Sequence, residues 1–292
     1  MTMKKILITG ASGFVGSHVA RMAREKNFEV VELKHKEVPL EERGVVEAYL
    51  KKVKPYAVFH LATSIVRSGK TASPQVVMRT NIEGSINLMD AALEVGVKAF
   101  INTGTFVEYG PKDHPIKEDE RCDPMEIYAV SKLAATLYVQ GLAERKEFPT
   151  ITLRLFTPYG SNMKEGSLLY NVVTNIQNKK PIALSDKKVT RDLIYVGDVA
   201  ELYLEAGEKA SKYKGEIFNV GSGTPTTLEE LVETVAGVTK TTAMPQWGAF
   251  PVQNYDKGVW QADMTKTFSH FTWRPKTALK EGLTKTIESM LV

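Results

Sequence analysis

The chain has 292 residues, 43% of them hydrophobic, so it is long enough to bury a large core but short for three domains. Its 38 basic and 34 acidic residues are spread along the chain and leave a net charge of +4, which favours a small anionic ligand over nucleic acid. The single cysteine, Cys122, excludes an internal disulfide and a cysteine-rich zinc site, and without a long apolar run or a signal-peptide pattern we expect a cytoplasmic protein with no metal centre and no membrane segment.

Strand and helix patterns alternate along the first half of the chain. Buried strands are predicted at residues 5–9, 29–33, 57–62, 99–104 and 151–156, and helices at residues 15–27, 43–53, 77–96 and 128–145. Strict alternation implies right-handed crossovers between neighbouring strands. The sequence therefore predicts an α/β fold with a doubly wound, Rossmann-type parallel sheet that has helices on both faces.

Beyond residue 156 the pattern becomes irregular, and its clearest pieces are residues 191–208 and 216–223. The sequence contains no internal repeat and no low-complexity linker, so a second lobe is expected to be built from insertions. The predicted domains are a Rossmann domain at residues 1–157 plus about 191–224, and a smaller α/β substrate lobe at residues 158–190 plus 225–292.

Three glycines, Gly10, Gly13 and Gly16, follow the first predicted strand at steps of three residues. In a doubly wound sheet this turn lies at the carboxyl edge, where dinucleotides bind. The first glycine allows a tight turn, the second lets a pyrophosphate approach the main chain, and the third lets the helix pack closely. The amino end of that helix offers free N–H groups to phosphates. A strand–turn–helix can also use glycines for packing alone, but their position after the first strand favours a dinucleotide site.

Tyr128 and Lys132 lie four residues apart at the start of a predicted helix, so their side chains share one face. The strand before this helix ends with Thr103 and Thr105, on the same edge of the sheet as the glycine turn. A phenol has a pKa of about 10, and a neighbouring ammonium group favours the phenolate. We expect Tyr128 to act as a general acid or base, Lys132 to lower its pKa, and Thr105 to donate a hydrogen bond to the reacting oxygen.

These patterns occur together with others in a recognisable order. The stretches "TGASGFVG", "HLA", "NTGTFVEYG", "YAVSK", "LRLFTPYG", "RDLIYVGDVA" and "FNVGSG", with Asn81 after the second, resemble the extended short-chain dehydrogenases, the group of nucleotide-sugar epimerases, dehydratases and reductases. The resemblance spans nearly the whole chain. It implies a domain that binds NAD or NADP, a carboxyl-terminal lobe that holds a nucleoside-diphosphate sugar, and an Arg191 that pairs with the diphosphate.

The resemblance also implies the residues of each site. The cofactor site would take Gly10, Ser12, Gly13, Phe14, Val15, Gly16, Lys34, His35, Lys36, Leu40, Leu61, Ala62, Thr63, Asn81, Thr103, Tyr128, Lys132, Phe156, Pro158 and Tyr159. The substrate site would take Thr105, Phe106, Tyr128, Thr157 and Arg191. Relatives pair the helices that correspond to residues 81–95 and 128–145 in a dimeric four-helix bundle, so we expect a homodimer.

The residues after Thr105 separate the reactions of this group. Family dehydratases have an Asp-Glu pair there, which protonates the leaving hydroxyl and takes a proton from the neighbouring carbon. In this chain Phe106 and Val107 follow Thr105, so dehydration lacks its acid and base. Two reactions remain, which are epimerisation with a retained NAD and reduction of a ketone with NADPH.

The end of the second predicted strand discriminates between the two cofactors. An acidic residue there accepts hydrogen bonds from the ribose 2′-hydroxyl and repels a 2′-phosphate. Lys34 stands where NAD-bound relatives usually have Asp, and His35 and Lys36 follow it. This cationic cluster favours NADP(H), with NAD(H) as the alternative, although the same residues are also typical of a solvated loop.

A further resemblance points to one branch of the group. "FINTGTFVEYG", "YAVSK" and the late "WGAFPVQNYDKGVWQAD" and "FTWRP" are similar to the CDP-abequose and CDP-paratose synthases, which reduce a 4-keto-6-deoxyhexose carried on a nucleotide. The chain departs from the pattern at Glu108, where relatives often have Val, and at Pro39 and Leu40, where an Asp usually meets the adenine.

The sequence therefore predicts an NADPH-dependent 4-ketoreductase of a nucleoside-diphosphate-4-keto-6-deoxyhexose, an enzyme of deoxysugar biosynthesis with Thr105, Tyr128 and Lys132 as catalytic residues. The alternative is an NAD-dependent nucleotide-sugar 4-epimerase that uses the same three residues. A non-catalytic NADP-sensing regulator is a remote alternative, because a fold does not determine a function.

Overall fold

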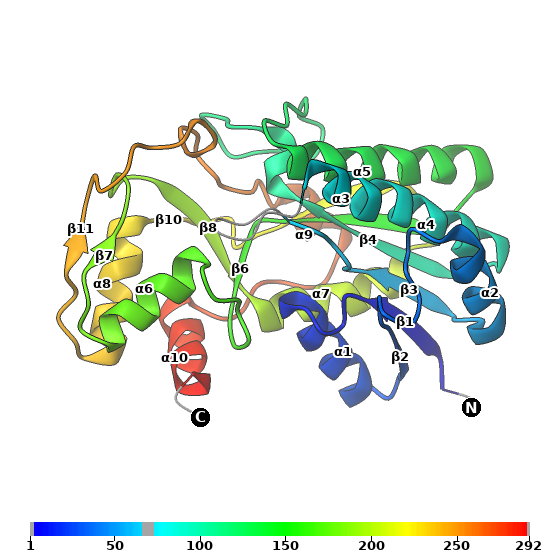
Figure 1. The fold of residues 1–292 in the computed structure, drawn as a ribbon, viewed down its shortest axis with the longest axis horizontal. Helices are drawn as coiled ribbons and strands as arrows, with labels where there is room; N and C mark the ends of the chain where they lie inside the picture. Colours follow the sequence, from blue (N-terminus) through cyan, green and yellow to red (C-terminus); the bar gives the residue numbers. More distant parts are fainter. Residues whose placement is uncertain (1–2, 66–72, 291–292) are drawn as a thin grey trace. The chain divides into compact units, whose positions relative to one another are not determined.

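The structure, a computed structural model, describes residues 3–65 and 73–290 (Figure 1). Its chain divides into two compact units. The first unit comprises Met1–Glu108, Cys122–Leu155 and Ala200–Phe218, and the second comprises Tyr109–Arg121, Phe156–Val199 and Asn219–Val292. The assignment of one domain to the cofactor and the other to the sugar stays a prediction.

A central sheet of six strands runs in the order β2-β1-β3-β4-β5-β9. Its strands are β1 (Lys5–Thr9), β2 (Glu29–Leu33), β3 (Ala57–His60), β4 (Ala99–Thr105), β5 (Thr150–Leu155) and β9 (Glu216–Val220). Strand β1 pairs in parallel with both β2 and β3, and β4 pairs in parallel with both β3 and β5. The chain thus turns to opposite sides of β1, which produces the switch point at which open α/β sheets bind ligands. The predicted Rossmann-type α/β fold is confirmed.

Helices cover both faces of this sheet. Helix α1 (Phe14–Glu25) packs on β1 and β2, and α5 (Ile127–Lys146) packs on β4 and β5. Figure 1 shows α4 (Gly84–Glu94) and α5 above the sheet and α1 below it. Helix α2 (Arg43–Val53) packs against α4. Both faces of the strands are therefore covered, which explains why β3 and β5 consist of buried residues throughout.

The predicted helix at residues 77–96 is divided into three segments. Helix α3 (Pro74–Met78) begins after Ser73, whose hydroxyl accepts a hydrogen bond from the backbone N–H of Val76. A single π-helical turn, η1 (Arg79–Glu83), joins α3 to α4. Such π turns frequently accompany functional sites.

The second unit contains two small sheets and several helices. Strands β6 (Thr157–Tyr159), β8 (Thr190–Tyr195) and β10 (Pro225–Thr227) form one sheet, and β7 (Ile182–Ala183) and β11 (Pro245–Gln246) form the other. The helices and single turns here are α6 (Leu168–Gln177), α8 (Leu228–Thr239), η3 (Asn254–Asp256), α9 (Thr265–His270) and α10 (Leu279–Ser289). Helices α6, α8 and α10 contribute to one apolar core, in which Val172, Leu231 and Leu283 are almost fully buried.

Two segments adjoin the boundaries between the units. The 3₁₀ turn η2 (Phe106–Tyr109) follows β4, and α7 (Val196–Lys209) follows β8. Across residues 3–65 and 73–290, every helix is too short or too polar to cross a membrane.

Candidate active site

The glycine turn after β1 has no room for a side chain at Gly10 or at Gly16. Gly10 has a φ of +69°, and a Cβ atom there would lie 2.7 Å from the backbone nitrogen of Ala62. A Cβ atom on Gly16 would overlap the carbonyl oxygen of Gly10. The N–H of Gly13 donates to the same carbonyl over 2.8 Å. Close backbone packing thus requires glycine at positions 10 and 16, as the sequence predicts.

Gly13 is also the N-cap residue of α1, and the first turn of this helix contains no acidic residue. Because Gly13 has no side chain, it leaves the amino end of the helix open to an approaching phosphate, and Phe14, Val15 and the exposed Ser12 surround that end. An N-terminal helical turn of this kind favours an anion through its N–H groups and its dipole. These features fit the pyrophosphate of a dinucleotide.

The loop after β3 is held against this turn by Thr9. The Thr9 hydroxyl accepts hydrogen bonds from the N–H groups of Leu61 and Ala62 and lies 2.7 Å from Nδ1 of His60. Nε2 of His60 lies 2.8 Å from the Ser85 hydroxyl. Burial lowers the pKa of His60 to about 3, so the ring is neutral. Sequence reasoning did not predict this structural role of His60. Because the N–H groups of Leu61 and Ala62 bond to the Thr9 side chain, the strand predicted at residues 57–62 ends at His60.

Asn81, in the π turn, connects the same loop to helix α5. Its amide nitrogen donates to the Ser64 carbonyl over 2.8 Å and to the Ser131 hydroxyl over 2.9 Å. Its amide oxygen accepts from the Ser64 N–H and the Thr63 hydroxyl. Ser131 in turn donates to the carbonyl of Tyr128. Asn81 therefore positions two predicted cofactor segments through its own side chain.

The predicted catalytic residues lie at the end of β4 and the start of α5. Thr105 is the last residue of β4, and Tyr128 and Lys132 stand in the first two turns of α5, which packs on β4. Lys132 is 2% exposed, and burial lowers its pKa to about 8 while the charge of Glu108 acts to raise it. The Thr105 N–H donates to Glu108 over 2.8 Å. Glu108 therefore binds the main chain of Thr105 and acts through its charge on Lys132.

Thr103 lies two residues before Thr105 and takes part in a partly buried contact. Its hydroxyl lies 2.6 Å from the phenol oxygen of Tyr203, on α7. Burial raises the pKa of Tyr203, and Tyr128 contributes to the shift, so the two phenols interact electrostatically. Sequence reasoning identified Thr103 but missed Tyr203, since α7 follows β4 only after about a hundred residues.

The three basic residues after β2 lie on the surface. Lys34 forms an ion pair with Glu37 at 3.5 Å, and its side chain is 67% exposed. His35 lies 3.7 Å from Glu41, and Lys36 is exposed. Exposed ion pairs of this kind contribute little energy, so Lys34 is available to a ligand at small cost.

Other predicted cofactor residues have buried side chains. Leu40 belongs to the core beneath α2 and α4, and its carbonyl accepts a hydrogen bond from Asn87. Tyr159 lies in the core of the second unit, 2% exposed, and its hydroxyl donates to the carbonyl of Leu279. Any contact of these two residues with a cofactor would therefore involve their main-chain atoms.

The remaining predicted residues belong to both units. Phe106 begins η2 in the first unit and is half-buried. In the second unit, Phe156 is buried and donates its N–H to the Val220 carbonyl, and the half-buried Thr157 and Pro158 follow it in β6.

Arg191, also in the second unit, is engaged with a carboxylate. Its guanidinium forms an ion pair with Asp256 of η3 and donates to the carbonyl of Thr190. The next residue, Asp192, is fully buried and accepts hydrogen bonds from the backbone N–H groups of Ser222, Gly223 and Ala262. Asp192 thereby holds the strand that carries Arg191. Sequence reasoning missed Asp256.

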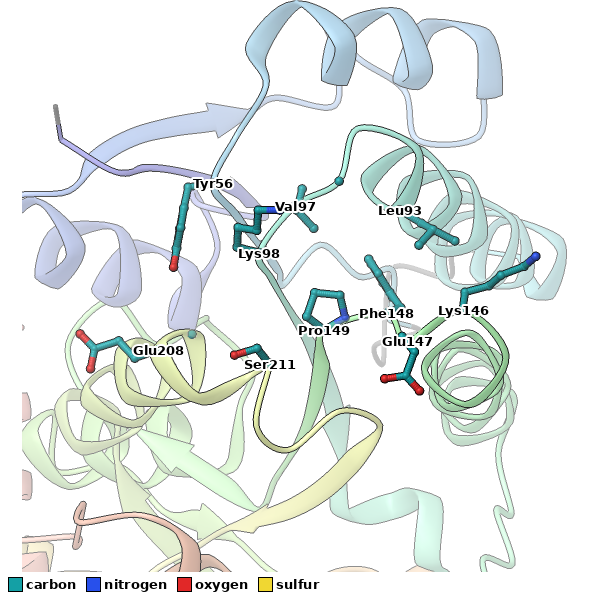
Figure 2. A pocket seen from close by; sticks show the side chains of 12 residues that line it. Tyr56, Leu93, Val97, Lys98, Lys146, Glu147, Phe148, Pro149, Glu208 and Ser211 are labelled. Atoms are coloured by element: carbon teal, nitrogen blue, oxygen red, sulfur yellow. The ribbon is translucent and has the colours of Figure 1, made fainter.

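A separate hollow opens at the amino ends of the strands. Figure 2 shows it, and residues that precede β3, β4 and β5 line it, among them Tyr56, Lys98 and Pro149. The end of α7 contributes Glu208. None of the predicted site residues lines this hollow, and dinucleotides bind at the opposite, carboxyl edge of such sheets. It is therefore distinct from the candidate active site.

The chain is similar to known proteins over most of its length. Residues 6–221 match the NAD dependent epimerase/dehydratase family. The UDP-glucose 4-epimerase of Mycolicibacterium smegmatis is 26% identical over 310 residues, which cover 97% of each chain. Among solved structures, the Thermotoga maritima UDP-glucose 4-epimerase with UDP-glucose is similar with a TM-score of 0.88 and 28% identity, over 98% of both chains.

The UDP-glucose 4-epimerase of Thermus thermophilus, in complex with NAD, is similar with a TM-score of 0.86 and 25% identity, over 98% of this chain and 99% of that chain. The similarity thus covers the glycine turn, the Thr105–Tyr128–Lys132 set and the second unit alike. The chain belongs to the NAD dependent epimerase/dehydratase family and is an NAD(P)-dependent short-chain oxidoreductase that acts on a nucleotide sugar, as its motifs predict.

Proposed function

We propose that the protein is an NAD-dependent UDP-sugar 4-epimerase. The observation that carries the proposal is the set Thr105, Tyr128 and Lys132 in a chain whose whole length resembles UDP-glucose 4-epimerases. Phe106 and Val107 follow Thr105, so an acid and base for dehydration are lacking at these positions. The comparisons thus favour the epimerase over the 4-ketoreductase that the sequence motifs predicted.

Each catalytic residue has a distinct task in this reaction. The glycine turn at Gly10, Gly13 and Gly16 would hold NAD, which would supply a hydride acceptor and donor for C4 of the sugar. Tyr128 takes the proton of the 4-hydroxyl as a general base. It gives a proton back to the C4 oxygen after the sugar has rotated in the site. The ammonium of Lys132 favours the phenolate of Tyr128, and the Thr105 hydroxyl donates a hydrogen bond to the C4 oxygen. Arg191 pairs with the diphosphate, in exchange for its contact with Asp256.

A direct test uses the purified protein without added cofactor. We expect NAD to remain bound through gel filtration and UDP-glucose to convert partly to UDP-galactose, measured by NMR. The same assay with dTDP-, CDP- and GDP-linked sugars defines the preferred base. Absence of any epimer, or an epimer formed only from sugars linked to another nucleotide, would contradict the proposal.

One observation favours a second candidate, an NADPH-dependent 4-ketoreductase of a nucleotide-linked 4-keto-6-deoxyhexose. Lys34, rather than an acidic residue, follows β2, where a 2′-phosphate would lie. A charge-assisted hydrogen bond to that phosphate contributes roughly 1.5–3 kcal/mol where it is partly shielded from water.

The Lys34→Asp variant therefore tests whether this residue recognises the phosphate. If the protein is the reductase, we expect NADPH affinity to fall by about ten- to a hundred-fold while NADH affinity stays the same. The two dissociation constants are measured for parent and variant at one salt concentration, because salt screens exposed charges. An unchanged ratio of the two dissociation constants would show that Lys34 is a solvated surface residue that does not bind the phosphate. The support for the reductase would then be removed.

A further inference from the structure

A buried ion pair lies directly behind the catalytic residues. Glu108 is fully buried, and Arg154, on β5, is 2% exposed. Nε of Arg154 donates to Glu108 over 2.9 Å, and Nη2 lies 3.3 Å from the sulfur of Cys122. Burying two charges is expensive, and a well-packed apolar pair of similar volume is often as stable. Stability alone is therefore a weak explanation for this pair.

The Glu108 carboxylate holds three elements together. One oxygen accepts the N–H of Thr105 over 2.8 Å, at the end of β4. The other accepts the hydroxyl of Thr136 over 3.2 Å, on α5, and the guanidinium of Arg154 on β5. Thr136 stands one helical turn after Lys132, so the two side chains share a face of α5. Glu108 is thus hydrogen-bonded both to Thr105 and to the helix that carries Lys132.

The backbone leaves space for this pair. A Cβ atom on Gly104 would lie 2.9 Å from Oε1 of Glu108 and 2.9 Å from Cγ of Arg154. The glycine that precedes Thr105 therefore allows the ion pair to approach the main chain of β4. The pair and the strand end fit each other closely.

Several ionisable groups surround Lys132. His60 on β3 interacts with the Lys132 charge and is neutral, because its pKa is lowered to about 3. Tyr128 lies one turn earlier on the same helix, and Arg154 is paired with Glu108. The negative charge of Glu108 acts to raise the pKa of Lys132, and it therefore opposes the effect of burial, which lowers that pKa.

We propose that Glu108 is a positioning residue, whose carboxylate keeps the ammonium of Lys132 charged and fixes the main chain of Thr105, while Arg154 holds Glu108 in place. This inference rests on the proposed function for the role of Lys132. The sequence motifs identify Glu108 only as a departure from the family pattern.

The test is a titration of Lys132 by NMR in protein labelled with ¹³C at the lysine ε-carbon. The signal of Lys132 is assigned by its loss in the Lys132→Arg variant. In the parent we expect a pKa of about 8. In Glu108→Gln, which keeps the shape but removes the charge, we expect the pKa to fall by roughly 0.5–1 unit.

The double variant Glu108→Gln with Arg154→Met guards against misfolding, because the single variant removes the carboxylate that pairs with the buried Arg154. We expect a smaller fall in the pKa of Lys132 there. The matched control is Asp90→Asn, since Asp90 accepts the Tyr138 hydroxyl over 2.6 Å farther along α5. Tyr138 lies roughly 9 Å from Lys132 by helical rise, so this control leaves the titration unchanged.

An unchanged or raised pKa in both Glu108 variants would overturn the proposal, as would the failure of both to fold. The titration needs no substrate, so a protein without epimerase activity would contradict the proposed function and leave this inference standing. In an active enzyme, we also expect the alkaline limb of the pH profile of kcat to move to lower pH in Glu108→Gln, with NAD retained.

Discussion

At the scale of single residues, two side chains of α5 lie in different surroundings. Tyr128 is half-buried, whereas Lys132 is almost fully buried. A buried ammonium is costly in free energy and is tolerated where its charge is used. We therefore make one prediction for Tyr128 and another for Lys132.

The Tyr128→Phe variant removes the phenolic hydroxyl and keeps the aromatic ring. We expect turnover to fall by roughly 10²–10⁴-fold, which is typical of a general acid or base. The amount of NAD that co-purifies with the protein should be unchanged, which provides the control for folding. Turnover within a factor of two of the parent would exclude Tyr128 from the mechanism.

The buried Lys132 predicts a pH dependence of stability. Burial lowers its pKa from 10.5 to about 8, so the unfolded chain binds more protons than the folded chain between these values. The free-energy cost of burying the charged Lys132 side chain is present below pH 8 and declines as the pH rises toward 10.5. We expect Lys132→Met to be inactive but to unfold at a higher temperature than the parent at neutral pH, with a difference that shrinks above pH 8.

Thermal unfolding measured across this pH range checks the expectation. Lys51→Met is the matched control, because Lys51 is exposed on α2 and its pKa is raised by Glu94. A stability difference between Lys132→Met and the parent that does not vary with pH would show that the charge of Lys132 is not the cause.

At the scale of elements, the turn between β1 and α1 shows which features local sequence can predict. Gly16 packs directly against Gly10, so a methyl group would displace the helix from the strand. We expect Gly16→Ala to lower the melting temperature and abolish retention of NAD. Gly44→Ala on α2 is the control, because no atom lies within 4 Å of its added Cβ. Equal effects of the two substitutions would contradict the packing argument.

The distance along the chain between contacting residues explains which features the sequence could not predict. The glycine turn and the Tyr128–Lys132 spacing depend on residues close together in the chain, and the structure has them in a strand–turn–helix and on one helix. The Arg154–Glu108 pair joins residues 46 positions apart, and Arg191 and Asp256 are 65 positions apart. Such partners become neighbours only through the packing of strands and helices. The π turn at Asn81 likewise follows from side-chain bonds to Ser64 and Ser131 rather than from periodicity.

At the scale of the whole molecule, α5 has apolar side chains on its solvent face. Leu137 is 59% exposed and Val130 is 39% exposed, two turns apart on the helix. On α3, Val76 is 48% exposed. Exposed apolar residues that recur at helical spacing indicate a second buried face. We propose that a second copy of the chain covers them in a homodimer.

Light scattering at working concentration checks the assembly. We expect the mass of a dimer for the parent and a shift toward the monomer for Leu137→Glu, since a charge would be buried without a partner. Val45→Glu on α2, where Val45 is 37% exposed, should remain a dimer. A monomeric parent would reject the homodimer.

The proposal that this protein is an epimerase makes a specific statement about the hydrogen at C4, which leaves the sugar and returns to the same carbon. The most direct measurement follows UDP-glucose labelled with deuterium at C4, incubated with the purified protein and no added cofactor. We predict UDP-galactose that keeps the deuterium at C4, as detected by NMR and mass. A protein that forms no epimer, but transfers deuterium from labelled NADPH to C4 of a nucleotide-linked 4-ketosugar, would contradict the account and establish the reductase.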